Sequence, residues 1–331
     1  MSAPVLAVRH LTKYFPCGTL GKSQQVHALE DASFELRPGQ IIALVGESGS
    51  GKSTTARLIA RLLPPTKGEI ILHDQDVLKT EPRAVSLSYR SQVQMIFQDP
   101  FGSLNGVKTI GYHLERPLLL HRRIKDRREL QEKVHDLLAI VGLTPPAEMA
   151  RKYPYQLSGG QRQRVAIARA LAVDPKVILA DEPISMLDVS IRMGVLNLLA
   201  QLKEERGLAY LYITHDIASA RYLADQTIVM YAGYMVEGAA SDELMQEPAH
   251  PYTQLLLSAV PNPHAHERRT IEARGEVPSL VDPPPGCPFA ARCPQVKSIC
   301  HEVMPGITHL NDHHWTRCHL YEGEGNWQRS T

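Results

Sequence analysis

Short runs of apolar residues, bounded by polar residues, glycine or proline, recur along this chain. Such runs are typical of strands that are buried on both faces of a parallel sheet. Where segments with helical spacing separate them, the pattern predicts the alternating strands and helices of an α/β fold. The strands predicted in this way are Gln40–Val45, Glu69–Leu72, Val93–Phe97, Lys176–Glu182, Ala209–Thr214 and Thr227–Tyr231.

The segments between these strands differ in their pattern. Thr54–Ala60 and Val189–Arg206 are predicted to be helices that follow strands. From about residue 99 to residue 160 the strand pattern disappears, and Lys125–Val141 has helical spacing with many charges, which predicts a helical subdomain. Val5–Leu36 is predicted to form early strands of an antiparallel subdomain, interrupted by a loop that contains glycine and lysine.

The composition is that of a cytosolic globular protein. The 331 residues include 36 Lys and Arg against 35 Asp and Glu, and the net charge of +1 gives no global field that would favour nucleic acid or acidic lipid. The longest uncharged apolar stretches, such as Gln226–Val236, are shorter than the ~18 residues of a membrane-spanning helix. Met1–Leu6 lacks the basic and apolar regions of a secretory signal. If this protein works at a membrane, we expect it to dock on a separate integral subunit.

A phosphate-binding motif follows the first buried strand. Gly46–Ser53 reads GESGSGKS, which fits G-x-x-x-x-G-K-[ST], and it lies between a predicted strand and a predicted helix, as a P-loop requires. Glycines let successive backbone N–H groups converge on an anion, and the helix N-terminus adds partial positive charge. We expect Lys52 to reach the β- and γ-phosphates and Ser53 to ligate Mg²⁺. The residues expected to hold the nucleotide here are Gly46, Ser48, Gly49, Ser50, Gly51, Lys52, Ser53 and Thr54.

Two carboxylates end the strand predicted at Lys176–Glu182. Ligands of open α/β sheets bind outside the carboxyl ends of the strands, so this is where a nucleotide site needs its acidic groups. We expect Asp181 to hold Mg²⁺ through its water shell and Glu182 to orient or deprotonate the attacking water. A strand end with two solvated acids is the ordinary alternative, and the joint occurrence of both motifs in the right order argues against it.

Further motifs follow in an order that resembles the nucleotide-binding subunits of ABC transporters, over nearly the whole chain. Leu157–Arg164 looks like the family's signature, and Phe97–Pro100 looks like its Q-loop. Ser185–Asp188 is similar to the D-loop, and Thr214–Asp216 to the segment that carries the switch histidine. The resemblance implies a P-loop NTPase core of α/β class: a mixed sheet with helices, an antiparallel β subdomain, a helical subdomain, and a small Cys-rich C-terminal extension.

The resemblance also assigns roles to single residues. Phe15 aligns with the aromatic residue that stacks on adenine, with Tyr14 as the alternative; either ring supplies a π-face. Gln98 resembles the residue that contacts Mg²⁺ or the lytic water, and His215 the residue that hydrogen-bonds the γ-phosphate. Catalysis is therefore assigned to Glu182, His215 and Gln98, and Mg²⁺ to Ser53, Gln98 and Asp181.

The signature is expected to act on ATP held by another subunit. Serine is a good N-cap and the two glycines permit close approach, so the helix that follows can present donors to an anion. Ser158, Gly159, Gly160 and Gln161, together with Asp188 of the D-loop, are the residues that the resemblance places at this ATP. One P-loop and one signature make this chain half of a working pair.

What the resemblance implies is an ATPase that powers an importer of peptides or related solutes. Its partners would be two permease subunits, a second ABC ATPase, and indirectly an extracytoplasmic solute-binding protein, with no nucleic acid, at the cytoplasmic face of the inner membrane. A heterodimer of ATPases is favoured over a homodimer, and the solute stays open. A soluble ABC ATPase that acts on DNA or ribosomes is the alternative; a non-catalytic scaffold is disfavoured by the intact Glu182 and His215. Met186 and Gln156 depart from the family's pattern and remove no catalytic group.

The chain changes character from about residue 248, and residues 261–331 are assigned as a C-terminal extension beyond a nucleotide-binding domain of residues 1–260. The extension holds four of the five cysteines, Cys287, Cys293, Cys300 and Cys318, in the pattern C-x₅-C-x₆-C-x₁₇-C. Clustered cysteines in a reducing compartment favour metal over disulfides. The resemblance to oligopeptide-importer ATPases implies a [4Fe–4S] cluster, for which four thiolates suffice; zinc and reduced thiols remain alternatives.

The histidines of this region and Cys17 are not assigned to a metal site. His301, His313, His314 and His319 are predicted to be surface residues rather than ligands, and Cys17, which lies alone near the N-terminus, is predicted to be a free thiol.

Overall fold

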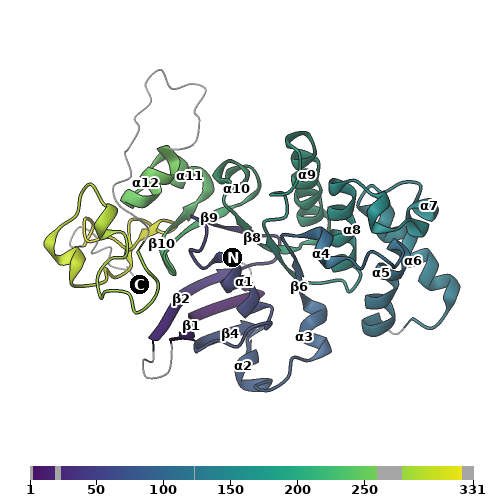
Figure 1. Ribbon diagram of the computed structural model, residues 1–331, viewed down its shortest axis with the longest axis horizontal. Coiled ribbons are helices and arrows are strands. Elements are labelled where there is room, and N and C mark those ends of the chain that lie inside the picture. Colours follow the sequence, from purple (N-terminus) through teal and green to yellow (C-terminus); the bar gives the residue numbers. More distant parts are fainter. Residues whose placement is uncertain (1–2, 19–23, 123, 259–277, 323–331) are drawn as a thin grey trace. The chain divides into compact units, whose positions relative to one another are not determined.

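The computed structural model describes residues 3–18, 24–122, 124–258 and 278–322 (Figure 1). The chain divides into two compact units, each made of several segments. The helical unit comprises residues 1–6, 36–40 and 72–213, and the P-loop unit comprises residues 7–35, 41–71 and 214–331. The boundary expected at residues 260 and 261 lies outside the described residues.

The helical unit has a small parallel sheet at its centre. Strand β7 (Val177–Asp181) pairs in parallel with β6 (Val93–Ile96) on one side and with β8 (Ala209–Thr214) on the other, so that Val177 lies opposite both Val93 and Ala209. Every residue of β7 is buried. The continuous apolar run therefore forms a central strand covered on both faces, as its pattern predicts.

Helices account for most of the remaining helical unit. Between residues 98 and 160 the described residues contain helices and no strand. Asp126 caps α6 by accepting a hydrogen bond from the Glu129 N–H (2.8 Å), and Val134, Leu137 and Leu138 form the buried face of that helix. The elements of this unit other than the sheet are β5 (Gln75–Asp76), α2 (Val77–Thr80), α3 (Leu87–Gln92), α4 (Pro100–Ser103), α5 (Ile110–Pro117), the π-helix η1 (Leu118–Arg122), α6 (Arg127–Ile140), α7 (Pro146–Arg151), the 3₁₀-helix η2 (Pro154–Gln156), α8 (Gly159–Leu171) and α9 (Val189–Arg206).

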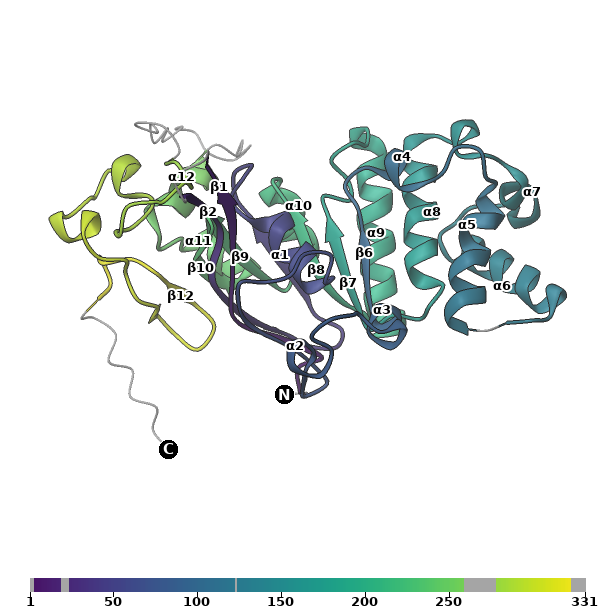
Figure 2. The ribbon, with the colours of Figure 1, turned by 60° about the horizontal axis from the view of Figure 1, so that its bottom comes forward.

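The P-loop unit is built on a mixed sheet, some of whose strands lie beside one another in Figure 2. Its strand order is β4-β1-β2-β10-β9-β3. Strand β9 pairs in parallel with β3 and antiparallel with β10, and β10 pairs in parallel with β2, which confirms the mixed sheet. The strands are β1 (Leu6–Cys17), β2 (Gln24–Leu36), β3 (Ile41–Val45), β4 (Lys67–Leu72), β9 (Gln226–Tyr231) and β10 (Tyr234–Ala240).

The C-terminal segment of the P-loop unit, residues 278–322, adds short elements to this sheet. Strand β12 pairs with β10 in antiparallel register, with Trp315 opposite Gly238, and a Cβ at Gly238 would lie 2.7 Å from the indole. Glycine at this position thus lets the tryptophan pack onto the strand. The remaining elements of the unit are α1 (Lys52–Ile59), α10 (Ile217–Leu223), α11 (Ser241–Gln246), α12 (Pro251–Ser258), the 3₁₀-helices η3 (Ala290–Arg292) and η4 (Ser298–His301), β11 (Thr308–His309) and β12 (Trp315–Thr316).

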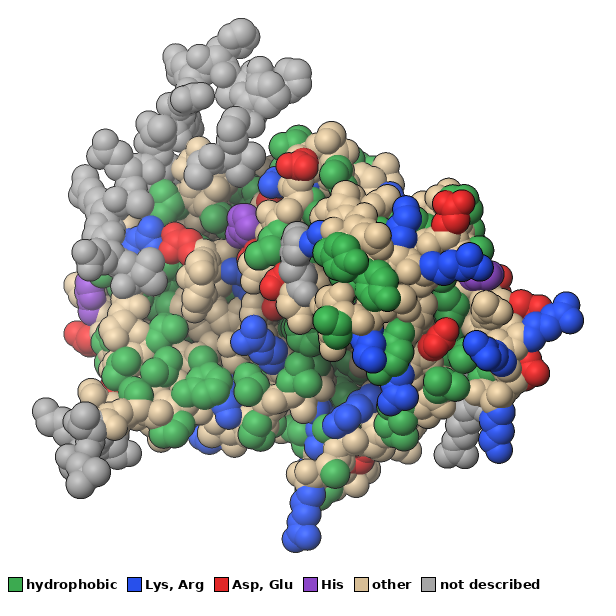
Figure 3. Space-filling model, turned by 45° about the vertical axis from the view of Figure 1, so that its right-hand side comes forward, with side chains coloured by type: hydrophobic (Ala, Val, Ile, Leu, Met, Phe, Trp, Pro, Cys, Tyr) green, Lys and Arg blue, Asp and Glu red, His purple; other side chains and the backbone are tan. Residues whose placement is uncertain are grey.

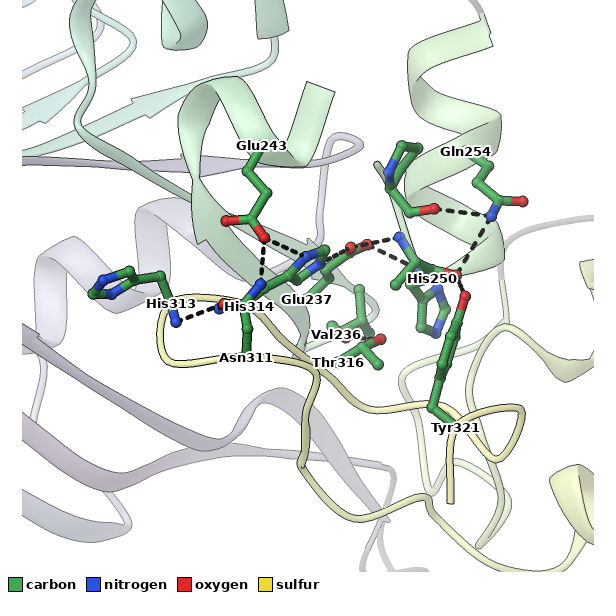
Figure 4. A network of polar contacts seen from close by, with 12 residues as sticks. Val236, Glu237, Glu243, His250, Gln254, Asn311, His313, His314, Thr316 and Tyr321 are labelled. Carbon is green, nitrogen blue, oxygen red and sulfur yellow. Dashed lines mark hydrogen bonds and ion pairs between the residues drawn. The ribbon is translucent and has the colours of Figure 1, made fainter. Parts of the chain in front are cut away.

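A buried polar network holds this segment against β10 (Figure 4). The Glu237 side chain is fully buried and accepts hydrogen bonds from the N–H groups of Ala249 (2.7 Å) and His250 (2.9 Å) and from His314 Nε2 (2.7 Å). His314 Nδ1 also lies 3.3 Å from the Glu243 carboxylate. Residues from two separate parts of the sequence thereby bind one carboxylate, and the sequence pattern gave no sign of this arrangement.

Among the described residues, no helix is both long enough and apolar enough to cross a membrane.

Candidate functional site

The P-loop follows β3 and leads into α1, in the strand, loop and helix order that the motif requires. Gly46, Gly49 and Gly51 have φ of +151°, +80° and +103°, in the region that favours glycine. A Cβ at Gly51 would lie 2.6 Å from the Ala28 carbonyl oxygen, and one at Gly46 would overlap the Met230 carbonyl. Both glycines are therefore required by backbone conformation and by close packing, so only this residue type can form the loop.

Lys52 is the first residue of α1, and its side chain is buried inside the loop. Its Nζ donates to the carbonyl oxygens of Gly46 (2.8 Å) and Glu47 (2.8 Å) and to Ser50 Oγ (3.3 Å). No side chain caps the N-terminus of α1, where Gly51 is the N-cap residue. A loop of N–H groups at a helix N-terminus with a buried ammonium at its centre is suited to bind the phosphates of a nucleotide.

The two aromatic candidates for adenine stacking have different surroundings. The Tyr14 hydroxyl donates to the Glu30 carboxylate (2.6 and 2.9 Å), and its ring stacks on His27 with centroids 4.1 Å apart. Burial, the hydrogen bond to Glu30 and the charge of Glu30 raise the pKa of Tyr14. Phe15 is half-buried, and Lys13 Nζ lies 4.8 Å from the centre of its ring. Tyr14 is thus held by contacts within the fold, which favours Phe15 as the stacking residue.

Two carboxylates, Asp181 and Glu182, lie at the end of β7. Asp181 is 2% exposed, and Glu182 follows it with φ +46°, a conformation that strains a residue with a side chain. The Glu182 N–H donates to the Ile213 carbonyl (2.9 Å), which holds it there. Gln98 Nε2 donates to Glu182 Oε2 (2.9 Å). The structure thus brings together Gln98 and Glu182, two of the three residues predicted to be catalytic.

The signature begins α8 in a capping box. Ser158 Oγ accepts a hydrogen bond from the Gln161 N–H (3.3 Å), and Gln161 Oε1 accepts one from the Ser158 N–H (3.0 Å). Ser158 is exposed and Gly159 half-buried. Gly160 is buried, and a Cβ there would overlap the Ile191 side chain of α9. Packing against α9 is therefore a reason for glycine at position 160 in addition to close approach of a nucleotide.

Two more predicted residues, Asp188 and His215, lie at the ends of elements. Asp188 is exposed and is the N-cap residue of α9, with no side-chain capping bond. Nearby, Met186 and Val189 are 54% and 77% exposed. In the P-loop unit, His215 is exposed directly after β8, and the Asp216 carboxylate caps α10 by accepting from the N–H groups of that helix.

All four cysteines of the C-terminal segment line one small cavity, together with His250 and Phe289. None forms a disulfide, and Cys17 is also a free thiol, as predicted. Burial, with a smaller contribution from the neighbouring cysteines, raises the pKa of Cys287 to about 12; burial likewise raises the pKa of Cys318 to about 11.

The raised pKa values of Cys287 and Cys318 favour their protonated forms, and a bound cation would favour their thiolates. Within the described ranges, no group of three or more His, Cys, Asp or Glu is arranged to hold a single metal ion. The four sulfur donors that line the cavity fit a sulfur-ligated group. His250 supports this fit, because its Nδ1 accepts from the Tyr252 N–H (3.0 Å) while its Nε2 is buried without a hydrogen-bond partner.

Two of the histidine predictions are wrong. His314 and His319 are 3% and 6% exposed, whereas His301 and His313 are exposed as predicted. His314 is buried because Glu237 supplies a buried acceptor for its ring, and His319 Nε2 lies 2.9 Å from the Val303 carbonyl oxygen. A histidine in a proline-rich segment gives no sign in the sequence that distant groups will satisfy it.

The sequence analysis also missed Glu47, Tyr252 and Arg292. Tyr252 Oη accepts a hydrogen bond from the Glu47 N–H (2.9 Å), and Arg292 Nη1 lies 3.1 Å from the Glu47 carboxylate. Glu47 occupies a position of the motif that any residue can fill, so the motif itself carries no signal for these contacts.

Comparisons with known proteins identify the family. The oligopeptide transport ATP-binding protein AppF of Bacillus subtilis is 44% identical over 96% of this chain and 97% of its own length. The dipeptide transport ATP-binding protein DppF of Escherichia coli is 44% identical over 93% of this chain and 92% of its own. The chain belongs to this family of ABC ATPases. Its residues 29–185 match the family described as ABC transporter, and residues 236–300 match the oligopeptide/dipeptide transporter C-terminal region.

Solved structures agree with this membership. The dimeric structure of the ATP-binding cassette MJ0796 bound to ADP and Pi covers 71% of this chain and 98% of its own, with a TM-score of 0.62 and 29% identity. The structure of cbiO1 from Clostridium perfringens covers 74% of this chain with a TM-score of 0.63 and 25% identity. As a member of the family, this ABC protein is an ATPase, and the transporter reading is favoured over a soluble ATPase that acts on DNA or ribosomes.

Proposed function

We propose that this ABC ATPase powers the uptake of peptides or related solutes through separate permease subunits, from the cytoplasmic face of the inner membrane. The observation that carries the proposal is the P-loop, in which a buried Lys52 is coordinated by backbone carbonyls at an uncapped helix N-terminus. The relatives named above, which are oligopeptide and dipeptide transport proteins, support the solute class.

In this proposal the residues of the P-loop hold ATP, with Ser53, Asp181 and Gln98 around Mg²⁺. Phe15 stacks on adenine, and Ser48, Gly49, Ser50 and Thr54 line the phosphates. Glu182 acts as the base or orienting group for the attacking water, and the hydrogen bond from Gln98 (2.9 Å) fixes its carboxylate before the reaction. His215 contacts the γ-phosphate. When bound, Mg²⁺ would neutralise the charge that develops on the phosphates.

The signature completes the site of a partner ATPase. Ser158 already caps α8, so its hydroxyl and the first N–H groups of the helix are held in place for an anion. The same ATP site is contacted by further residues at the start of α8, Gly159, Gly160 and Gln161, and by Asp188 of the D-loop. A heterodimer with a second ABC ATPase is the form that we propose, with two permeases attached and a solute-binding protein acting outside.

Apolar side chains exposed on the helical unit fit the permease contact. Hydrophobic side chains reach the surface on the face that Figure 3 presents. In the helical unit the large hydrophobic residues that are at least 38% exposed include Phe97, Val107, Tyr112, Leu119, Leu120 and Tyr155. Where such side chains form a contiguous patch, they mark a surface that a partner covers.

For the tail we propose a [4Fe–4S] cluster ligated by Cys287, Cys293, Cys300 and Cys318. The support is the convergence of four free thiols on one cavity and the unpaired donor of His250 beside them. Anaerobic purification followed by absorbance and iron analysis tests it. Protein that contains one zinc ion, or no metal, would contradict the proposal.

Two variants test the ATPase assignment in the full chain. Lys52→Ala removes the buried ammonium, so tight ATP binding is expected to be lost. Glu182→Gln keeps the hydrogen bond to Gln98 within reach but removes the base, so it is expected to bind ATP and to accumulate as an ATP-loaded dimer with its partner. ATPase rate and dimer mass measure both. Hydrolysis at the parental rate by either variant would refute the assigned roles.

A further inference from the structure

Glu47, in the P-loop, is held by groups from several parts of the P-loop unit. Its N–H donates to the Tyr252 hydroxyl (2.9 Å), and its carboxylate accepts from Arg292 Nη1 (3.1 and 3.2 Å). Its carbonyl oxygen accepts from Lys52 Nζ (2.8 Å) and from the Ser50 N–H (3.2 Å). The backbone N–H, the backbone carbonyl and the side chain of this one loop residue are thus all bound, and two of the partners lie more than two hundred residues away.

The two distant partners are themselves fixed by packing. Tyr252 is fully buried, and its ring lies against those of Tyr231 (centroids 4.5 Å apart) and Phe289 (5.4 Å). The Arg292 guanidinium lies 5.7 Å from the Tyr231 ring centre and donates to the Tyr231 hydroxyl (3.2 Å). Arg292 is only 9% exposed. A guanidinium held by stacking and hydrogen bonds has little freedom, so it can set the position of the carboxylate it binds.

Arg292 belongs to the part of the tail that carries the cysteines. It ends η3, and its N–H donates to the Phe289 carbonyl (3.0 Å), while the N–H of the next residue, Cys293, donates to Ala290 (3.3 Å). The Cys287 N–H donates to the Cys300 carbonyl (2.8 Å), which closes the same loop. The backbone that positions the guanidinium is therefore the backbone that lines the cysteine cavity.

We propose that Arg292 and Tyr252 are positioning residues of the nucleotide site, through which the cysteine-rich tail sets the affinity of the P-loop for ATP. The proposal rests on the phosphate-binding role assigned to the P-loop. Lys52 must leave the carbonyls of Gly46 and Glu47 to reach phosphates, and the two distant residues fix where the Glu47 carbonyl lies. A loop that is held in place loses less conformational entropy when the nucleotide binds, so releasing it weakens binding.

Three variants of the full chain test the proposal by titration with Mg²⁺ and AMP-PNP. Tyr252→Phe removes one hydroxyl and keeps the ring packing; Arg292→Gln removes the ion pair. Both are expected to raise the Kd by about 2- to 30-fold, the range of mutations that act through another residue. Arg317→Gln is the matched control: it breaks another ion pair of the same tail, to Asp31 (2.6 Å), in which no P-loop residue takes part, and its Kd is expected to stay parental.

A double-mutant cycle separates positioning from general destabilisation. If Arg292 acts through the Glu47 carboxylate, Arg292→Gln does not raise the Kd further in a Glu47→Gln background. Tyr252→Phe acts on the Glu47 backbone N–H, so it still raises the Kd in that background. Arg292→Lys restores part of the affinity because it keeps the charge and loses the planar fork. Thermal unfolding of each variant shows whether it folds; if Arg292→Gln does not, Tyr252→Phe decides.

Lys52→Ala distinguishes failure of the positioning role from failure of the P-loop assignment. If it abolishes binding while Arg292→Gln and Tyr252→Phe bind as the parent does, the positioning role is overturned and the P-loop assignment stands. If Lys52→Ala itself binds as the parent does, the P-loop assignment is overturned. An equal loss of affinity in Arg317→Gln and Arg292→Gln would also overturn the positioning role, because it would reflect the tail in general.

Discussion

Replacing the buried carboxylate of Glu237 is expected to loosen the C-terminal segment from β10. In Glu237→Gln one acceptor oxygen becomes an NH₂ group that faces a backbone N–H of Ala249 or His250, and these N–H groups donate to the carboxylate at 2.7 and 2.9 Å in the parent. Each hydrogen bond to a charged group contributes about 1.5–3 kcal/mol, and an unsatisfied buried donor costs about 1–3 kcal/mol. His314 also loses its charged partner. We expect the opening of this segment to become easier by about 3 kcal/mol, or roughly two orders of magnitude in its equilibrium constant.

The same pair predicts a dependence on pH. Burial opposes the charged form of His314, but its hydrogen bond to Glu237 and the charges of Glu237 and Glu243 raise its pKa above the ordinary value. A folded pKa above the unfolded value of about 6.5 means that the stabilisation is fully present below pH ~6.5 and is lost as the pH rises through the folded pKa. The segment should therefore open more readily in alkaline solution, and Glu237→Gln should lose most of this dependence.

Hydrogen exchange measures the opening directly. The Arg317 N–H donates to the Val236 carbonyl (2.8 Å) across the β10 and β12 pair, so peptides that contain Arg317 report when the segment leaves the strand. Glu243→Gln is the control, because Glu243 meets the same histidine at 3.3 Å but is partly exposed, and less than about 1 kcal/mol is expected. Exchange in Glu237→Gln within about threefold of the parent at every pH would refute the reasoning.

Two further predictions concern the helical unit. Gly160→Ala places a Cβ against Ile191, so α8 or α9 must shift and ATPase activity is expected to fall. Adding Ile191→Ala is expected to restore part of the activity. The absence of rescue would show that the glycine serves another purpose. Gln98→Ala releases the Glu182 carboxylate, so kcat is expected to fall by about tenfold to a hundredfold while the Kd for AMP-PNP measured without Mg²⁺ stays parental. Steady-state kinetics and titration check this, and a raised Kd without Mg²⁺ together with an unchanged kcat would contradict it.

The local sequence pattern predicted an element correctly where that element depends on its own residues alone. The helix expected at Val189–Arg206 and the strand expected at Ala209–Thr214 have those same bounds in the structure. The continuous apolar character of β7 predicted a strand buried on both faces, and the glycines of the P-loop predicted its backbone. In both cases the information lies within a few consecutive residues, through side-chain burial in one and backbone freedom in the other.

The C-terminal segment contains contacts that the local sequence pattern did not predict. His314 was expected at the surface, and it is buried because Glu237, seventy-seven residues away, supplies its partner. Arg292 carried no signal at all, since an arginine beside a cysteine has no periodicity to interpret. Only folding brings it to Glu47. Such contacts depend on the packing of strands and loops that are far apart in the sequence, and no local property of either partner encodes them.

The sequence by itself therefore determined the class of fold, the nucleotide motifs and the order of most elements, because backbone preference and burial act over short distances. The tertiary structure alone decided that the C-terminal segment pairs with β10 and that Glu47 is bound by Tyr252 and Arg292. It also decided that Gln98 meets Glu182 and that Gly160 must make room for Ile191. The physical reason is the same in each case: polar groups and side-chain volumes find their partners across the fold, where sequence distance carries no information.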